Sequence, residues 1–290
     1  MIDRLEIPEK LETPDSLEIA DRLQVPDSLK IPDRLEILNI WVDPVDMEQA
    51  LSQVRQFVEK GTRPHCIFAV NPEKEFSIPK DPVLYEIFKK ADLLIPDGIG
   101  VVYAARILHG ARLSRVPGVD LMAKICELAA QEGYRIFIYG AREEVNAAAC
   151  AALIERYPGL KIAGRSDGFV KDEDMPDLVA KINDSKAQIL FLALGSPKQE
   201  KWFSAWKDSL KSVRVVQGIG GTLDTIAGTV KRAPEFWQKC SAEWLYRLLK
   251  EPSRIRRQNV LPIFASTIIF AKLIKAQVQT VLDLTQGRRE

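Results

Sequence analysis

The sequence has 290 residues, of which 46% are hydrophobic and 28% charged, and a formal net charge of +1. These values are ordinary for a soluble chain of one large or two small domains, and they give no reason to expect a nucleic-acid partner. The charge is unevenly spread, because residues 1–38 hold ten acidic and five basic side chains, whereas residues 244–290 hold nine basic and three acidic. The two ends are therefore expected to meet different partners.

Neither the start of the chain nor its cysteines indicate export or a metal site. The opening residues MIDRLEIPEK lack the apolar region of a secretory signal, and the four cysteines show no metal-ligand or disulfide spacing. The acidic run at 172–174, DED, is expected to be a solvated helix cap. We therefore expect a cytosolic protein that uses no metal or other cofactor.

The first residues form a tandem repeat with a period of six. Its units read DRLEIP, EKLETP, DSLEIA, DRLQVP, DSLKIP and DRLEIL. Proline closes most units and removes a backbone donor each time, which disfavours long strands and helices. We predict a mostly disordered arm over residues 1–37, with a short stacked-turn structure or a docking arm as the alternative.

Alternating strands and helices are predicted from residue 38 onward. Helices are expected at 45–61, 81–92 and 99–110, the first with Asp46 near its cap and Gly61 after its end. Apolar runs that read as strands occur at 38–42, 65–71, 91–98, 134–141, 161–168, 187–195 and 213–221. Strands that are apolar throughout indicate a largely parallel sheet covered on both faces, so the predicted fold class is a Rossmann-like α/β domain over residues 38–242.

Polar residues and glycines interrupt the apolar runs where five of the predicted strands end. They are Asn71, Asp97 with Gly98, Gly140, Gly195 with Ser196, and Gly220 with Gly221. In open parallel sheets, ligands bind outside the carboxyl ends of the strands, so these residues are candidates for one cleft. Taken alone, Gly140 would serve a tight turn, and Asp97 could equally be a helix cap.

Three dense blocks between Gly195 and Arg257 add to these candidates. They read GSPKQE, GIGGTLDTIAGTVKRAP and EWLYRLLKEPSRIRR. Glycines beside charged and amide side chains are typical of a phosphate-binding or sugar-binding cleft. The arginines of the third block stand among tryptophan, tyrosine and leucine, which suggests an anionic ligand near a hydrophobic surface.

Eight short blocks follow one another along residues 38–258. They read NPE (71–73), PDGIGVV (96–102), SRVPGVDL (114–121), YPGLKIAG (157–164), LGSPKQEKW (194–202), GIGGTLDTIAG (218–228), KRAPEFW (231–237) and EWLYRL with EPSRIRR (243–257). In their sequence and order they resemble the WecG/TagA/CpsF glycosyltransferases, bacterial enzymes that extend lipid-linked sugars in cell-envelope polymer synthesis.

The resemblance implies an inverting transfer of an N-acetylmannosamine-type sugar from a UDP-sugar to a polyprenyl-diphosphate-linked N-acetylglucosamine. Asp97 matches the family's proposed base, which would take the proton of the acceptor hydroxyl. One departure is Ala69, where many family members carry a threonine, and this leaves the donor sugar open. The residues expected to bind substrate are Asn71, Gly98, Arg115, Gly195, Gln199, Glu200, Gly220, Gly221, Arg247, Arg254 and Arg257.

The basic C-terminal region, residues 243–290, is predicted to be a membrane-facing appendage. Its segment 259–276 is apolar for about a dozen residues and is then interrupted by Lys272 and Lys275. Since a span needs roughly 20 apolar residues, we expect an amphipathic element on the bilayer surface. A helix packed on the domain or on a second copy of the chain is the alternative. The family resemblance places the arginines in a lid over the diphosphates, and it implies a location on the inner face of the plasma membrane.

Two other classes of protein remain open from the residues alone. A nicotinamide-dependent oxidoreductase would share the sheet and the GIGG loop, but no GxGxxG motif opens a helix after the first strand. A non-catalytic scaffold could use the repeat arm and the basic tail to organise other envelope enzymes.

Overall fold

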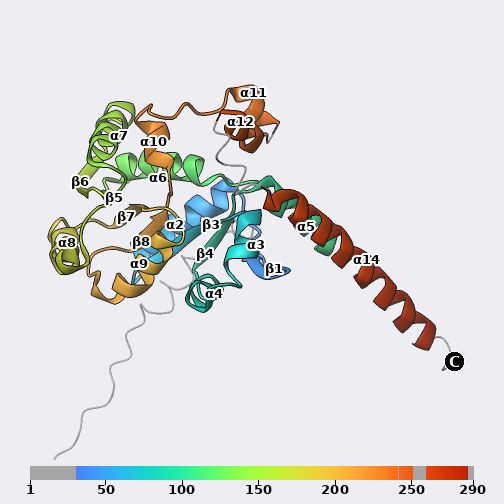
Figure 1. Cartoon of the computed structure of the whole chain (residues 1–290). Coiled ribbons are helices and arrows are strands. Elements are labelled where there is room, and N and C mark those ends of the chain that lie inside the picture. Colours follow the sequence, from blue (N-terminus) through green and yellow to red (C-terminus); the bar gives the residue numbers. More distant parts are fainter. Residues whose placement is uncertain (1–30, 241, 251–258, 287–290) are drawn as a thin grey trace, which may run out of the picture. The chain divides into compact units, whose positions relative to one another are not determined.

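A six-stranded parallel sheet forms the centre of the fold (Figure 1). The computed structural model describes residues 31–240, 242–250 and 259–286. The sheet has the strand order β4-β3-β8-β7-β5-β6 and confirms the predicted Rossmann-like α/β class. Its strands are β3 (His65–Val70), β4 (Leu93–Pro96), β5 (Arg135–Gly140), β6 (Lys161–Ser166), β7 (Ile189–Ala193) and β8 (Val215–Gly218).

The strands are apolar throughout because both faces of the sheet are covered. On β5, Phe137 and Tyr139 pack into one core cluster, whereas Ile136 and Ile138 pack into a second cluster on the other face. All four side chains are at most 1% exposed. A strand buried on two sides loses the alternation of polar and apolar residues, which is why these strands could be recognised as central ones.

Helices cover the two faces of the sheet in the way that the alternating pattern predicts (Figure 1). The first cluster includes side chains from α4 (Pro82–Lys89), α5 (Ile99–His109), α8 (Met175–Asp184) and α9 (Lys198–Trp206). The second includes side chains from α2 (Met47–Lys60), α6 (Gly118–Glu132), α7 (Glu143–Arg156) and α10 (Thr222–Ile226). Shorter elements are α3 (Pro72–Ser77), η2 (Asp172–Asp174), η3 (Lys207–Ser209), α11 (Glu235–Lys239) and α12 (Glu243–Lys250).

Helix α2 begins and ends where its sequence signals place it. The Asp46 carboxylate accepts a hydrogen bond from the backbone N–H of Gln49 at 2.8 Å, and the Gln49 side chain accepts one from the Asp46 N–H at 3.0 Å. This reciprocal pair satisfies donors that the first turn of a helix leaves open. Gly61 follows the last residue, as expected.

A small hairpin differs from the predicted strand at 38–42. It consists of β1 (Leu35–Ile37) and β2 (Ile40–Val42), which pair antiparallel. The predicted arm over residues 1–37 therefore ends inside an ordered element. The physical reason is that the sixth repeat unit closes with Leu38 instead of proline, so the chain can turn there, with a φ of 57° at Leu38, and pair with itself.

The hairpin is joined to the sheet through Arg34. Its guanidinium donates to both carboxylate oxygens of Asp43, at 2.7 and 2.8 Å, and to the carbonyl of Ala91 at 2.8 Å. Asp43 in turn accepts from the backbone N–H of Leu94 on β4 at 2.7 Å. Because these donors and acceptors are partly buried, the ion pair fixes the hairpin beside β4.

The long helix α14 (Val260–Gln286) corrects one expectation. Its first turns pack against α3 and α5, where Phe264 and Ile268 are 3% and 2% exposed in the core. The helix continues through Lys272 and Lys275, and its stretch Val260–Val278, 19 residues, is long and apolar enough to cross a bilayer. The length of the apolar segment therefore does not exclude a crossing, contrary to the sequence argument.

Candidate functional site

A pocket of about 870 Å³ opens at the carboxyl ends of β3, β4, β7 and β8. These four strands are neighbours in the sheet, so the loops that follow them meet at one edge. The pocket brings together nine of the residues predicted from the sequence. They are Asn71, Asp97, Gly98, Arg115, Gly195, Gln199, Glu200, Gly220 and Gly221.

Gly140, the fifth predicted strand end, does not line this pocket. It ends β5, which lies beyond β7 in the sheet order. A Cβ atom at Gly140 would come within 2.5 Å of the carbonyl group of Ala193, and its φ is 125°. Glycine is therefore needed at this position for close packing between two strand ends, which agrees with the turn interpretation and removes Gly140 from the candidate site.

Asp97 follows β4 directly and lies at the beginning of two helices. Its carboxylate Oδ1 accepts a hydrogen bond from the backbone N–H of Gly118, the first residue of α6, at 3.1 Å. The N-cap of α5 is Gly98 and not Asp97, so the helix-cap alternative fails for that helix. A carboxylate oxygen that points into a pocket is the kind of group that can accept a proton from a bound hydroxyl.

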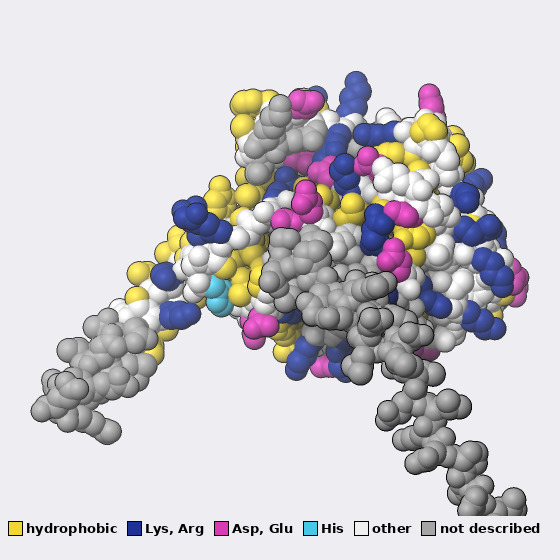
Figure 2. Space-filling view, turned by 180° about the vertical axis from the view of Figure 1, so that it is seen from behind, with side chains coloured by type: hydrophobic (Ala, Val, Ile, Leu, Met, Phe, Trp, Pro, Cys, Tyr) yellow, Lys and Arg dark blue, Asp and Glu magenta, His cyan; other side chains and the backbone are white. Residues whose placement is uncertain are grey.

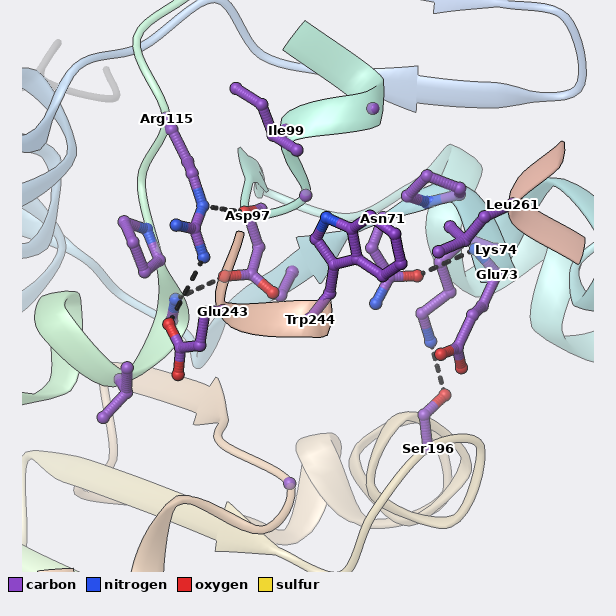
Figure 3. A pocket seen from close by; sticks show the side chains of 18 of the residues that line it. Asn71, Glu73, Lys74, Asp97, Ile99, Arg115, Ser196, Glu243, Trp244 and Leu261 are labelled. Carbon is purple, nitrogen blue, oxygen red and sulfur yellow. Dashed lines mark hydrogen bonds and ion pairs between the residues drawn. The ribbon is translucent and has the colours of Figure 1, made fainter. Parts of the chain in front are cut away.

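Arg115 connects Asp97 to the C-terminal appendage (Figure 3). Its Nε donates to the backbone carbonyl of Asp97 at 2.7 Å, and its Nη2 lies 3.7 Å from Oε2 of Glu243. Glu243 is the first residue of α12 and is only 6% exposed. Its neighbour Trp244 also lines the pocket, so α12 closes the site on this side.

A buried ion pair forms the opposite side of the pocket. Asn71 caps α3 by accepting from the N–H of Glu73 at 3.1 Å, and α3 carries Lys74. The Lys74 ammonium donates to Oε1 of Glu200 at 3.0 Å and contacts the hydroxyl of Ser196 (Figure 3). The side chains of Lys74 and Glu200 are 8% and 1% exposed, so this pair joins α3, which follows β3, to α9, which follows β7, inside the protein.

Gln199 and Gly220 shape the glycine loop after β8. The Gln199 side-chain oxygen accepts from the backbone N–H of Gly220 at 3.0 Å. Gly220 has a φ of 52° and Gly195 a φ of 74°, values that favour glycine. Both loops therefore present backbone close to the pocket, as phosphate-binding loops do.

The described lining of the pocket is acidic overall. It contains five carboxylates and two cations, and Lys74 and Arg115 each already contact a carboxylate. A ligand that carries a diphosphate would need further positive charge at this site. Three predicted ligands could supply it, but Arg254 and Arg257 lie outside the described residues, as does the side chain of Arg247 in α12.

Sequence reasoning missed several residues of the pocket. Glu243 and Trp244 belong to the EWLYRL block, in which only the arginine was predicted to bind a ligand. Lys74 gave a weak signal, as a lysine three residues after Asn71. The apolar wall formed by α5 and α14 was missed as well, and it comprises Tyr103, Ile107, Leu261, Phe264, Ala265, Ile268 and Ile269.

The fold and the position of the pocket are typical of α/β proteins that bind a ligand at the carboxyl edge of a parallel sheet. A model of the glycosyl transferase WecG/TagA/CpsF family matches residues 35–278. The chain therefore belongs to this family and is a glycosyltransferase. This membership also argues against the oxidoreductase and scaffold alternatives.

Two relatives in Bacillus carry the same name, N-acetylglucosaminyldiphosphoundecaprenol N-acetyl-beta-D-mannosaminyltransferase. The protein of Bacillus spizizenii is 36% identical over 203 residues, which cover 70% of this chain and 78% of the relative. The protein of Bacillus subtilis is 37% identical over 205 residues, with the same coverage of 70% and 78%.

Proposed function

We propose that this protein transfers an N-acetylmannosamine-type sugar from a UDP-sugar to a polyprenyl-diphosphate-linked N-acetylglucosamine. The names of the two relatives support this donor sugar and this lipid-linked acceptor. The observation that carries the proposal is the position of Asp97, whose carboxylate lies in the pocket at the start of α6, next to Arg115.

The reaction assigned to the site is a single displacement with inversion. The acceptor hydroxyl attacks the anomeric carbon of the donor, and its proton passes to the Asp97 carboxylate as the new carbon–oxygen bond forms. The bond between the anomeric carbon and the β-phosphate oxygen breaks, and the electron pair leaves with UDP. Because the acceptor hydroxyl gives up its proton to Asp97, the attacking oxygen stays nucleophilic while negative charge collects on the departing UDP.

The leaving diphosphate needs stabilisation that the described lining supplies only in part. The amino end of α5, which begins at Ile99 with no side-chain cap, offers backbone donors, whereas the Gly220 N–H is already donated to Gln199. Since the described lining holds more carboxylates than cations, we assign Arg247, Arg254 and Arg257 to the diphosphates. We also assign the enzyme to the inner face of the plasma membrane, where a polyprenyl-linked acceptor and cytosolic UDP-sugars meet.

The test is a transfer assay with the full chain, a polyprenyl-diphosphate-N-acetylglucosamine acceptor and a panel of UDP-sugars. UDP-N-acetylmannosamine should be the preferred donor. Asp97→Asn keeps the size of the side chain and its acceptor for Gly118, and it should lower kcat by about 100- to 10,000-fold. Asp172→Asn, an exposed carboxylate outside the pocket, is the control. Unchanged kcat in Asp97→Asn would remove Asp97 as the base.

A further inference from the structure

The pocket has an apolar half that neither nucleotide nor sugar chemistry explains. Two helices form it, with Tyr103 and Ile107 from α5 and Ile269 from α14. These three side chains are 58%, 39% and 57% exposed, so they are available to a ligand. Figure 2 shows hydrophobic side chains along α14, with lysines among them. Large exposed apolar groups that continue a binding pocket usually mark part of the ligand site.

Helices α5 and α14 lie side by side and run in the same direction (Figure 1). Near their beginnings, a Cβ atom at Gly100 would lie 3.7 Å from the Phe264 ring. Further along, the Lys275 ammonium donates to the carbonyl of Leu108 at 3.3 Å. The two contacts are eight residues apart on α5, which corresponds to roughly 12 Å of helix.

The groove between these helices begins beside Asp97, the proposed base. Helix α5 starts two residues after Asp97, and its first turn is part of the polar half of the pocket. Tyr103 and Ile107 follow one and two turns later, because residues four apart share a helix face. The groove, which is the part of the pocket lined by α5 and α14, therefore leads from the strand ends along α5 as far as Ile107 and Ile269.

We propose that the groove binds the first isoprene units of the acceptor's polyprenyl chain. This inference rests on the proposed function, which places the acceptor's sugar beside Asp97. In such an acceptor the sugar, the diphosphate and the chain follow one another in a line. The polar half of the pocket takes the sugar and the diphosphate, so the chain leaves through the apolar half, where its burial is favourable. The pocket would thus recognise the lipid part of the acceptor as well as its sugar.

Two soluble acceptors test the proposal without a membrane or micelle. Both carry N-acetylglucosamine diphosphate, one with a single isoprene unit and the other with three. For the wild-type chain, the KM of the three-unit acceptor should be about tenfold lower or better, because more apolar surface is buried. Ile107→Ser and Ile269→Ser should each move the ratio of the two KM values toward one.

Ile263→Ser is the matched control. Ile263 lies on the same helix as Ile269 and is 52% exposed, but it does not line the pocket. The control should keep the wild-type KM ratio. An equal loss in Ile263→Ser and Ile269→Ser, or a wild-type ratio of one, would overturn the proposal.

Two further measurements separate other occupants of the groove. Co-sedimentation with phosphatidylglycerol vesicles and size-exclusion chromatography are run on all variants. If Ile107→Ser and Ile269→Ser keep the KM ratio but lose vesicle binding or self-association, the surface serves a bilayer or a second copy, and the proposal is wrong.

A binding assay distinguishes failure of this inference from failure of the proposed function. Equilibrium dialysis compares farnesyl diphosphate with inorganic diphosphate and needs no transfer reaction. Tighter binding of farnesyl diphosphate, weakened by Ile107→Ser, supports the groove even if no sugar is transferred. Transfer with equal KM for both acceptors supports the function and refutes the groove.

Discussion

Replacing Lys74 by methionine should destabilise the protein strongly. The Lys74 ammonium lies 3.0 Å from Oε1 of Glu200 and 4.7 Å from the centre of the Phe88 ring. Glu200 is 1% exposed, and no described residue donates a hydrogen bond to its second oxygen, Oε2. Methionine fills a similar volume but leaves the Glu200 charge buried without its partner.

The size of the effect follows from this burial. Removing one partner of a buried ion pair typically costs about 3–5 kcal/mol, because the remaining charge stays desolvated. At about 2–4 °C for each kcal/mol in a domain of this size, Lys74→Met should lower Tm by roughly 6–20 °C. The double variant Lys74→Met with Glu200→Leu removes both charges and should recover most of the loss, to within about 2 kcal/mol of the wild type.

Urea unfolding of the wild type, the two single variants and the double variant measures this coupling directly. Lys201→Met is the control, since Lys201 pairs with Asp81 while 45% of its side chain is exposed, and exposed pairs contribute less than about 1 kcal/mol. If Lys74→Met costs no more than Lys201→Met, or if the double variant is less stable than Lys74→Met, the reasoning from burial is wrong.

Three other outcomes are expected. Gly220→Ala should cost about 1–2 kcal/mol of stability, because φ is 52° there, and should raise the KM for the donor; unchanged stability in urea unfolding would contradict this. Burial raises the pKa of Asp92, but hydrogen bonds from Arg63, Cys66 and His65 outweigh this effect and hold the pKa below its ordinary value of 3.8. The ionised carboxylate therefore stabilises the fold above pH 3.8, and this contribution is lost as the pH falls through the lowered pKa. Asp92→Asn should therefore cost about 2–4 kcal/mol at pH 7 and less below pH 4, and a cost independent of pH would refute the assignment. The rate of transfer should be insensitive to EDTA. If EDTA lowers the rate and Mg²⁺ restores it, a metal ion contributes to the stabilisation of the diphosphate that is assigned to the arginines.

Most of the sheet could be predicted because its strands are apolar on both faces. The pattern could not show which strand ends border the pocket, since that depends on the strand order. Gly140 looked equivalent to Gly195 and Gly220, but its strand lies on the far side of β7. The shortest elements could not be predicted from the sequence either. The three-residue strands of the hairpin and the six-residue α3 are too brief to establish a period.

Two parts of the candidate site depend on contacts between distant residues. Lys74 and Glu200 are 126 positions apart, so nothing local indicates that their charges meet in the interior. The lysines of α14 were interpreted as the end of an apolar segment. In the structure, Lys272 and Lys275 are exposed, and the helix continues beneath them, because long basic side chains can reach solvent from an apolar helix.

The contact between Arg115 and Glu243 holds the first turn of α12 beside the pocket. Under the proposed function, a diphosphate that approaches Arg115 competes with the Glu243 carboxylate for the same guanidinium, whose Nη2 lies 3.7 Å from Glu243. By thermodynamic reciprocity, the factor by which this pair weakens anion binding equals the factor by which a bound anion weakens the pair. The first turn of α12 would then act as an internal competitor that raises the apparent Kd of the nucleotide.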